Sequence, residues 1–298
     1  MEYRQLGSTG LEVSALGFGG AEIGREQASQ ETVDTLLRSA IDSGLNVVDT
    51  AAAYFESEKL IGKALAGIRR QVVLMSKCGA LDGFTREDWS KKGILETITN
   101  SLTLLNTDHL DVIQLHSCDA EILGRGEAIE ALIVAKERGY TRFAGYSGDS
   151  KDAAYALGLD FFDTLQTSVS IADQEARELT IPAAVEKVIG VIAKRPVANV
   201  VWAYETRPDY SYHQEYWDRV EELRYPFLTA PLSESVALAL RFTLSVEGVS
   251  TAIVGTTKPG RWPENARRVK EGPLPEAEFE AIRERWREVA SEDWVGQV

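Results

Sequence analysis

The hydrophobic positions of this chain follow two alternating patterns. Short apolar runs have the length of buried strands, whereas the segments between them carry apolar residues three or four positions apart, as amphipathic helices do. Glycines such as Gly44 stand where several of these helices should end. The expected strands are Ala15–Phe18, Val47–Asp49, Gln71–Ser76, His109–Leu115, Tyr140–Gly145, Thr164–Gln166, Val191–Ala193 and Thr251–Val254, and the expected helices are Gln30–Ser43, Ser57–Leu65, Ile94–Leu105, Ala128–Arg138, Lys151–Leu157, Pro182–Ile189, Ser233–Leu244 and Arg261–Glu271.

Alternation of strand and helix, repeated about eight times with short connections, predicts an α/β fold of the (β/α)8 TIM barrel type. Before the first barrel strand, Tyr3–Leu6 and Leu11–Val13 flank a Gly-rich turn and predict a β-hairpin. At the other end, Glu276–Glu288 predicts an extra amphipathic helix. A doubly wound sheet is the alternative, but no G-x-G-x-x-G turn follows Ala15–Phe18. We expect one domain over residues 1–298.

The composition of the chain makes several classes of protein, such as nucleic-acid-binding and membrane proteins, poor candidates. The 298 residues carry a formal net charge of −14, which disfavours nucleic-acid binding because that requires a basic surface. Cys78 and Cys118 follow apolar runs and are expected to be buried thiols in a reducing compartment. The first residues lack the apolar core of a signal peptide, and no apolar stretch is long enough to span a bilayer. We therefore expect a cytoplasmic protein without a membrane partner.

Polar side chains stand at or just past three successive strand ends. Asp49 ends one apolar run, Lys77 follows the next, and His116 follows the third. Tyr54 lies in the loop after Asp49. Each residue alone has an ordinary structural explanation, such as a capping aspartate or a core histidine. In a barrel, however, the carboxyl ends of all strands meet at one face, so the four side chains should converge there.

Proton transfer to a carbonyl oxygen is the chemistry that these four residues suggest. A free tyrosine has a pKa of about 10, and a neighbouring ammonium such as Lys77 is expected to lower it. Asp49 would keep Lys77 charged and positioned, while His116 would orient the substrate carbonyl and share its developing negative charge. A metal site fits less well, because one His and one Asp give too few ligands and the lysine opposes a cation.

The whole set of motifs resembles the aldo-keto reductase superfamily over nearly the whole chain. The Asp/Tyr, lysine and histidine strands of that family are similar to VVDTAAAYFESEKLIGKAL, VVLMSKCG and DVIQLHSCD of this sequence. The start, YRQLGSTGLEVSALGFGG, resembles the family's hairpin and first strand, and TAIVGTTKPGRWPEN resembles its late cofactor segment. The resemblance implies that Asp49, Tyr54, Lys77 and His116 form the family's catalytic tetrad.

The resemblance also implies a nicotinamide cofactor that lies across the barrel mouth without a Rossmann domain. Gln166 and Ser147 match residues that hold the carboxamide, and Arg261 matches an arginine on the 2′-phosphate, which favours NADPH. Gly255 stands where many relatives carry a phosphate-binding lysine, which leaves NADH as an alternative. The remaining matches are Thr256 and Thr257 near the phosphates, and Glu264 and Asn265 at the adenine. Glycines around the first strand end, Gly20 among them, allow close approach of a ligand or form a tight turn.

Two positions depart from the family pattern. Gly148 stands where the family has an asparagine, and Lys194 stands where it has an aromatic that stacks on the nicotinamide. An aromatic of the long segment Val197–Pro231, which we expect to be irregular, could replace that ring; Trp202 and Tyr204 are the candidates. His213 in the same segment is expected to be exposed, and the tail after the last helix is short enough to leave the pocket open.

Three functions follow from this resemblance. The first is an NADPH-dependent reductase of aldehydes or ketones, in which Tyr54 supplies the proton. The second is an NAD(P)-dependent sugar or alcohol dehydrogenase, since the same residues serve both directions. The third, motivated by Gly148 and Lys194, is a nucleotide-binding regulatory subunit with little turnover. The sequence specifies neither the individual substrate nor the oligomeric state.

Overall fold

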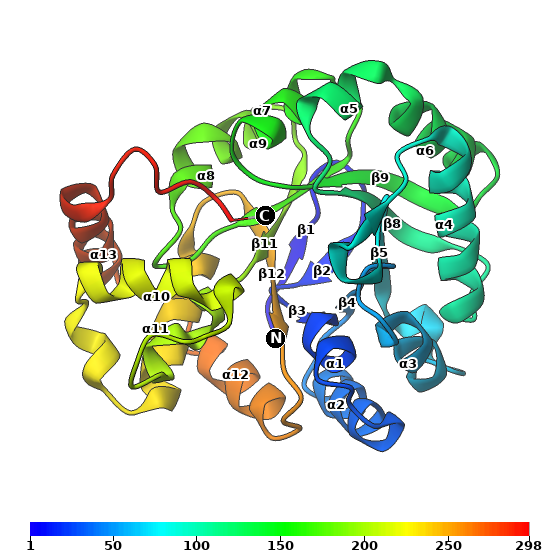
Figure 1. Ribbon diagram of the computed structural model, residues 1–298. Coiled ribbons are helices and arrows are strands. Elements are labelled where there is room, and N and C mark those ends of the chain that lie inside the picture. Colours follow the sequence, from blue (N-terminus) through cyan, green and yellow to red (C-terminus); the bar gives the residue numbers. More distant parts are fainter. Residues whose placement is uncertain (298) are drawn as a thin grey trace.

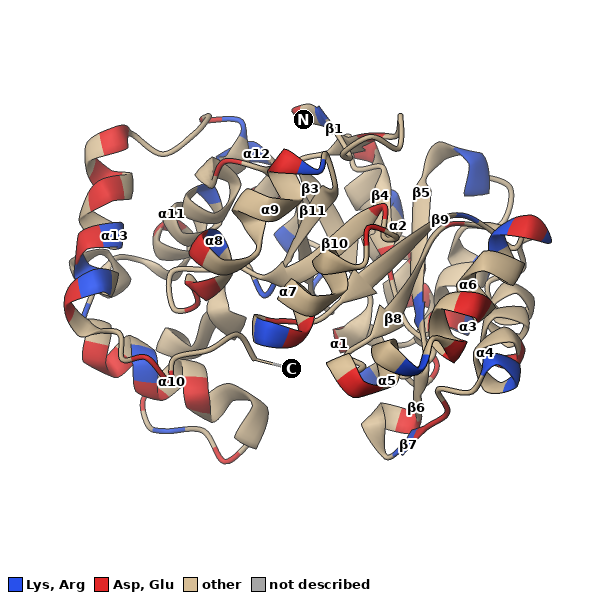
Figure 2. Cartoon of the chain, turned by 90° about the horizontal axis from the view of Figure 1, so that it is seen from above, with Lys and Arg blue, Asp and Glu red and all other residues tan. Residues whose placement is uncertain are grey.

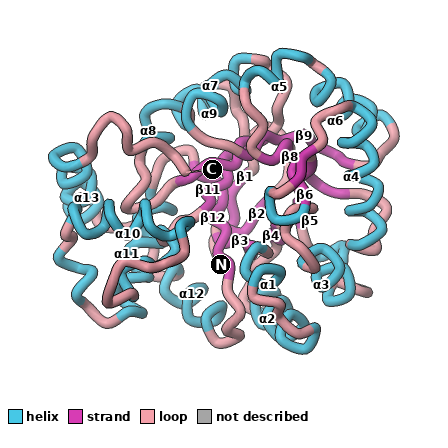
Figure 3. Tube along the Cα trace, viewed as in Figure 1, coloured by secondary structure: helices cyan, strands magenta, loops and turns pink. Residues whose placement is uncertain are grey.

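The computed structural model describes residues 1–297, and its centre is a closed barrel of parallel strands (Figures 1 and 3). The barrel closes where the last strand pairs with the first, with Ala252 opposite Leu16. Helices form the outer ring around these strands, as the sequence predicts. The barrel strands are β3 (Leu16–Gly19), β4 (Val47–Asp49), β5 (Val73–Cys78), β8 (Leu110–His116), β9 (Thr141–Ser147), β10 (Thr164–Ser168), β11 (Gly190–Lys194) and β12 (Val249–Gly255).

The expected helices are present, with ends that differ by a few residues. They bury apolar residues in the large cluster against the strands, and Figure 2 shows that the outer helices carry many of the charged residues of the chain. They are α2 (Gln30–Asp42), α3 (Ser57–Ala64), α4 (Lys91–Leu104), α6 (Glu127–Glu137), α7 (Ser150–Gly158), α9 (Ile181–Glu186), α11 (Leu232–Ser245), α12 (Arg261–Val269) and the C-terminal α13 (Glu276–Val289). Within residues 1–297, none of the helices has the length and apolar character needed to cross a membrane.

A hairpin closes the N-terminal end of the barrel. β1 (Tyr3–Gln5) and β2 (Glu12–Ser14) pair antiparallel, which confirms the predicted hairpin. Leu6, Leu11 and Val13 of this hairpin join a buried cluster whose other members come from the barrel strands. The hairpin therefore covers the end at which the strands begin, and the end at which they finish lies on the opposite side.

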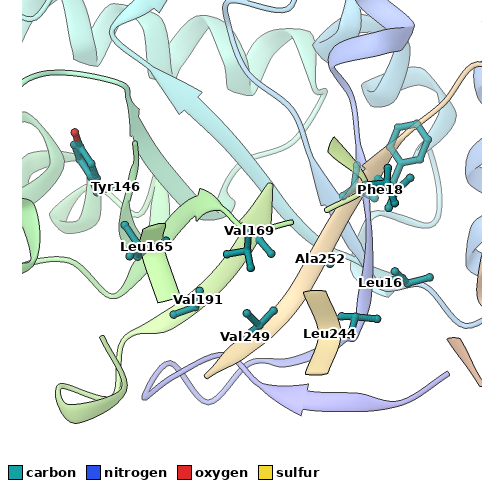
Figure 4. Packing of buried hydrophobic residues seen from close by; sticks show 14 of the residues in the cluster. Leu16, Phe18, Tyr146, Leu165, Val169, Val191, Leu244, Val249 and Ala252 are labelled. Atoms are coloured by element: carbon teal, nitrogen blue, oxygen red, sulfur yellow. The ribbon is translucent and has the colours of Figure 1, made fainter. Parts of the chain in front are cut away.

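Alternation along each strand separates two apolar layers. The second residue of a strand, such as Val48 or Leu74, packs in the large cluster between strands and helices, where Figure 4 shows Leu16, Leu165 and Val191. Its neighbours Val47 and Met75 belong to the interior cluster instead. Because side chains alternate with a period of two, the inward row continues to polar residues at the strand ends.

Residues 197–231 contain more regular structure than expected. The irregular segment predicted here contains α10 (Ser211–Leu223) and the short turns η3 (Ala198–Ala203) and η4 (Pro226–Thr229). The prediction was wrong because the buried face of α10 is made by Tyr216, Val220 and Leu223 together with an arginine, which obscures its helical period. Other elements missed in the loops after strands are α1 (Ala21–Arg25), α5 (Ala120–Arg125), α8 (Glu175–Leu179), and the small hairpin of β6 (Ala80–Leu81) and β7 (Arg86–Glu87).

Candidate active site

A buried ion pair stands at the mouth of the barrel. Lys77 Nζ lies 2.5 Å from Asp49 Oδ2, and both side chains are almost fully removed from solvent. The ammonium also donates to the carbonyl of Thr50 at 3.0 Å. β4 and β5 place the two residues on the inward row of neighbouring strands, which brings together two positions 28 residues apart. A charge buried in this way is tolerated because its partner and hydrogen bonds replace water.

Tyr54 and His116 complete a cluster around this pair. Lys77 Nζ lies 5.0 Å from the centre of the Tyr54 ring, and the His116 ring meets that ring edge-on at 5.4 Å. Phe84, from the short turn after β6, is the second ring in contact with His116, with 4.6 Å between the ring centres. The structure therefore brings together the four residues that the sequence places at the mouth.

The protonation of Tyr54 differs from the sequence-based expectation. Removal from water raises the pKa of Tyr54 well above its usual value of about 10, and the Asp49 carboxylate raises this pKa further. The predicted lowering by Lys77 was wrong because that ammonium is neutralised by Asp49 at 2.5 Å. Tyr54 is consequently a neutral phenol at physiological pH, and within residues 1–297 its hydroxyl has no hydrogen-bond partner.

His116 is a neutral imidazole. Burial lowers its pKa well below the usual value near 6.5, and the charges of Lys77, Lys194 and Arg195 lower it further. Its Nδ1 is buried without a hydrogen-bond partner among the described residues. A neutral ring can donate one hydrogen bond to a carbonyl oxygen without adding a fourth positive charge to the site.

Amide side chains connect this cluster to the neighbouring strands. Gln166 Nε2 donates to Asp49 Oδ1 at 2.9 Å, and Gln114 Nε2 reaches the same oxygen at 3.2 Å. Ser147 in turn donates to Gln166 Oε1 at 3.2 Å. Ser147 and Gln166, predicted to hold a cofactor carboxamide, therefore lie beside the catalytic cluster and belong to the same hydrogen-bond network.

Gly20 has a structural role in the placement of these residues. Its N–H donates to the Asp49 carbonyl at 2.8 Å, and its carbonyl accepts from Ser57 at 2.8 Å. A Cβ at Gly20 would lie 2.7 Å from Ser57 Oγ, so the ends of β3, β4 and α3 come together only with glycine here. Gly24 also permits close packing, since a Cβ added at this position would lie 2.0 Å from the Tyr54 carbonyl oxygen. Close packing of α1 thus fixes the loop that carries Tyr54.

The predicted cofactor residues of the late segment lie at the end of β12 and in α12. Gly255 is the last residue of β12, and its Cβ would lie 1.6 Å from Glu22 Oε2, so a lysine could not occupy this position without moving Glu22. Thr257 donates to Glu26 at 2.6 Å and thereby fastens this loop to the end of α1. Thr256 accepts from the Lys258 N–H at 3.1 Å.

Helix α12 begins with groups suited to an anion. Its N-cap residue, Gly260, provides no side-chain cap, but the Arg261 N–H already donates to the Lys258 carbonyl at 3.1 Å and Pro263 has no N–H. The N–H of Trp262 is among the first-turn groups that are left for a ligand. Arg261 is half-buried and lies 3.3 Å from Glu264, while Asn265 is buried one turn further on. The three residues lie on one short stretch of helix, as the sequence predicts.

The two departures from the family pattern have physical explanations. At Gly148, a Cβ would lie 2.6 Å from the Tyr146 ring, whose hydroxyl donates to the Cys118 carbonyl at 2.6 Å. Lys194 is buried and forms an ion pair with Asp149 at 2.8 Å. Burial lowers the pKa of Lys194 to about 8 against the opposing effect of Asp149. An ion pair thus occupies the strand end where the family pattern places an aromatic ring.

Neither proposed aromatic substitute lies at that strand end. Trp202 donates to Ser235 Oγ at 3.0 Å, and Tyr204 is 44% exposed and contacts His213. Tyr212 instead hydrogen-bonds to Arg195, next to Lys194. His213 was predicted to be an exposed loop residue, but it is half-buried in α10, because the surrounding tyrosine rings cover it.

The segment after α13 closes part of the mouth that we expected to be open. Figure 1 shows it running from α13 at the rim toward the middle of the barrel. The Gly296 N–H donates to Glu175 at 2.7 Å, and the Gln297 carbonyl accepts from Arg195. No periodic pattern of side chains predicts this contact, because it uses main-chain groups of residues 296 and 297.

Fold and site together define a barrel enzyme that combines a buried lysine–aspartate pair with a neutral tyrosine and a neutral histidine. The model of the Aldo/keto reductase family matches residues 15–287, and the chain belongs to this family. Membership makes the protein an NAD(P)H-dependent oxidoreductase that reduces small carbonyl compounds.

Relatives of known name match most of the chain. It is 29% identical over 287 residues to L-galactose dehydrogenase of Arabidopsis thaliana, which covers 91% of this chain and 89% of that protein. It is 27% identical to aldo-keto reductase YhdN of Bacillus subtilis, over 88% of this chain and 86% of that one. Among solved structures, the holo form of aldo-keto reductase AKR11C1 from Bacillus halodurans has a TM-score of 0.84 and 27% identity, with 99% of each chain covered.

Several residues of the mouth were missed by sequence analysis. Asp149, Arg195, Gln114 and Glu22 all contact predicted site residues or lie beside them. Gln114 could have been found, because it stands two positions before His116 on an inward row. The others lie just beyond strand ends, where the side-chain alternation stops and only tertiary packing sets direction.

Proposed function

We propose that this protein reduces aldehydes or ketones with NADPH and that Tyr54 supplies the proton. The observation that carries the proposal is the buried Asp49–Lys77 pair in contact with the Tyr54 ring, which in turn meets His116. These four groups provide a neutral proton donor, a second hydrogen-bond donor and a fixed positive charge within one small volume. That combination suits a reaction in which negative charge develops on a carbonyl oxygen.

Each residue of the catalytic cluster would have a separate role in carbonyl reduction. When bound, the reduced nicotinamide supplies hydride to the carbonyl carbon. The Tyr54 phenol donates its proton to the oxygen, which becomes a stronger base than a phenolate as charge develops on it. His116 donates a second hydrogen bond to the same oxygen, and Lys77 stabilises the Tyr54 phenolate that remains. Asp49 holds Lys77 in place, and the Gln114 and Gln166 amides hold Asp49.

The residues around the mouth are compatible with a dinucleotide phosphate. The uncapped start of α12 and the guanidinium of Arg261 offer hydrogen-bond donors to a phosphate group. The hydroxyls of Thr256 and Thr257 lie in the loop directly before this helix. Ser147 and Gln166 would hold the carboxamide beside the catalytic cluster, with Lys194 and Gly20 at the edges of this part of the mouth, and Gly255, Glu264 and Asn265 would line the nucleotide.

A carbonyl panel tests the proposed function. Purified protein should oxidise NADPH in the presence of some aldehydes or ketones, followed by absorbance of the reduced nicotinamide. The same panel run with sugars or alcohols and NADP+ measures the reverse direction, since proton transfer through Tyr54 is reversible. Tight binding of NADPH with no turnover in either direction would contradict the proposal.

Arg261→Ala tests the cofactor preference. We expect the variant to bind NADPH about 10- to 100-fold more weakly and NADH almost unchanged, because an arginine–phosphate contact contributes about 1.5–3 kcal/mol. Dissociation constants are measured by quenching of protein fluorescence. Arg267→Ala, an exposed arginine in the last turn of the same helix, is the matched control. Equal weakening of NADPH and NADH would show that Arg261 does not contact the 2′-phosphate.

A further inference from the structure

Arg195 is a cation of the mouth to which the proposed reaction assigns no role. It directly follows Lys194 at the end of β11, and its side chain is only 9% exposed. Its backbone is held at a φ of 54°, a left-handed conformation that costs a non-glycine residue about 1–2 kcal/mol. A bulky charged residue kept in such a conformation indicates that the surrounding structure holds this side chain in a required place.

The positive charge of Arg195 has no carboxylate of its own. Asp149 Oδ2 lies 4.0 Å from Arg195 Nη1, and the same oxygen already pairs with Lys194 at 2.8 Å. The other Asp149 oxygen accepts from Thr167 at 2.8 Å and from the Ser168 N–H at 2.7 Å. In the part of the chain that the structure describes, no further acidic side chain comes within 4.0 Å of this guanidinium.

Neutral oxygen atoms surround the guanidinium instead. Nη1 donates to Ser168 Oγ at 2.7 Å and to the main-chain carbonyl of Gln297, while Nε donates to the Tyr212 hydroxyl at 2.7 Å. These contacts satisfy the hydrogen bonds of the guanidinium, and its nearest carboxylate, Asp149, is shared with Lys194. The Gln297 carbonyl reaches the guanidinium because residues 295–297 lie in the mouth, where the Gly296 N–H donates to Glu175.

Arg195 is also close to the reacting groups. Its partner Ser168 stands two positions after Gln166 on β10, and Gln166 donates to Asp49 at 2.9 Å. The charge of Arg195 also lowers the pKa of His116 and opposes the rise in the pKa of Tyr54. Lys77 and Lys194 each have a close carboxylate partner, whereas Arg195 only shares Asp149 with Lys194 at 4.0 Å, so its guanidinium can still bind a ligand. A carboxylate or phosphate oxygen that replaced the Gln297 carbonyl would form a charge-assisted and potentially bidentate contact.

We infer that Arg195, with Ser168 Oγ and the Tyr212 hydroxyl, is a receptor for an anionic group of a ligand, and that the Gln297 carbonyl occupies it in the free protein. This inference rests on the proposed function for the nature of the reaction. Because Arg195 lies near His116 and Tyr54, the anion we expect is a carboxylate on the substrate, which makes carboxylated aldehydes the preferred class. A phosphate of the cofactor has the same chemistry, and the experiments below distinguish the two sources.

The substrate experiment compares 4-oxobutanoate with its methyl ester, which has the same reacting aldehyde without the charge. We expect Arg195→Gln to lower kcat/KM for the acid by about 10- to 100-fold, mainly by raising KM. For the ester, kcat/KM of the variant should stay within about threefold of the wild-type value. Arg195→Lys should recover part of the loss, since it restores the charge but not the planar fork. Arg207→Gln, an exposed arginine paired with Asp218, is the control.

The binding experiments need no turnover. Succinate and pyrophosphate are titrated into the cofactor-free protein by calorimetry at constant ionic strength, and the NADPH dissociation constant is measured for the same variants. Weaker succinate binding by Arg195→Gln with unchanged NADPH binding identifies a substrate carboxylate. At least tenfold weaker binding of NADPH and pyrophosphate, with equal acid-to-ester ratios, identifies the cofactor phosphates. Unchanged binding of all three overturns the inference, whether or not the protein reduces any carbonyl.

Gly296→Ala tests whether the Gln297 carbonyl occupies the anion site at Arg195 in the free protein. A Cβ at this position would lie 2.5 Å from Asp149 Cβ, so the variant should displace Gln297 from Arg195. We expect several-fold tighter succinate binding, because the competing carbonyl is removed. Gly158→Ala, which meets open space, is the matched control. Weaker succinate binding by Gly296→Ala would show that residues 295–297 build the site, and would overturn their role as its occupant.

Discussion

Tyr54→Phe should abolish carbonyl reduction while leaving the protein folded and able to bind NADPH. Loss of the general acid is expected to lower kcat about 10²- to 10⁴-fold, since no other group of the cluster is a neutral donor in contact with both Lys77 and His116. Stability should not change, because the Tyr54 hydroxyl makes no hydrogen bond within residues 1–297. The measurements are steady-state kinetics, NADPH titration and thermal unfolding.

A matched control shows whether the effect is specific to the Tyr54 hydroxyl or follows from removing any tyrosine hydroxyl. Tyr204→Phe removes the same atom from a ring that is 44% exposed, and it should leave turnover within about twofold. If Tyr54→Phe kept more than about a tenth of the wild-type kcat, the proton would have to come from another group. His116 would then be the next candidate, which His116→Ala in the Tyr54→Phe background would reveal.

Lys77→Met should destabilise the protein as well as inactivate it. Removal of the ammonium leaves the Asp49 carboxylate buried, with amide donors from Gln114 and Gln166 as its side-chain partners. Breaking a buried ion pair in this way costs about 3–5 kcal/mol in the free energy of unfolding. The variant also lacks the charge that stabilises the Tyr54 phenolate, so turnover should fall below that of Tyr54→Phe or equal it. Denaturant unfolding at neutral pH measures the stability loss.

Two further variants test whether the unpaired Asp49 carboxylate causes the loss of stability in Lys77→Met. Lys77→Met combined with Asp49→Leu should recover much of the stability and none of the activity, because no uncompensated charge remains in the core. Lys59→Met breaks the exposed pair with Glu56 and should cost less than about 1 kcal/mol. A double variant no more stable than Lys77→Met alone would mean that packing, and not the unpaired carboxylate, causes the loss.

Gly148 and Lys194 differ from the family pattern, but neither residue leaves a gap or an unpaired charge at the barrel mouth. Tyr146 fills the space beside Gly148, and Asp149 pairs with Lys194, so each change has a partner in the structure. The third function considered from the sequence, a regulatory subunit with little turnover, was motivated by these positions alone. The intact cluster of Asp49, Tyr54 and Lys77 favours catalysis instead.

Much of the fold was accessible from the sequence, because strands and helices are local patterns. Each barrel strand was found from its apolar run, and longer helices between the strands, such as α2 and α4, were found from their apolar spacing. The same reasoning placed Asp49, Lys77 and His116 at one face, since they end parallel strands. The helix α10 was missed because tyrosines and a buried arginine interrupt its apolar period.

What the sequence determined by itself is the barrel, the N-terminal hairpin and the four residues that meet at the barrel mouth. The tertiary structure decided the protonation of Tyr54, because burial and the neutralised Lys77 outweigh the effect expected from a neighbouring lysine. It also decided that Lys194 pairs with Asp149 and that residues 295–297 contact Arg195. The difference is physical: backbone periodicity is local in the chain, whereas the charge and solvent around a side chain depend on which distant segments fold against it.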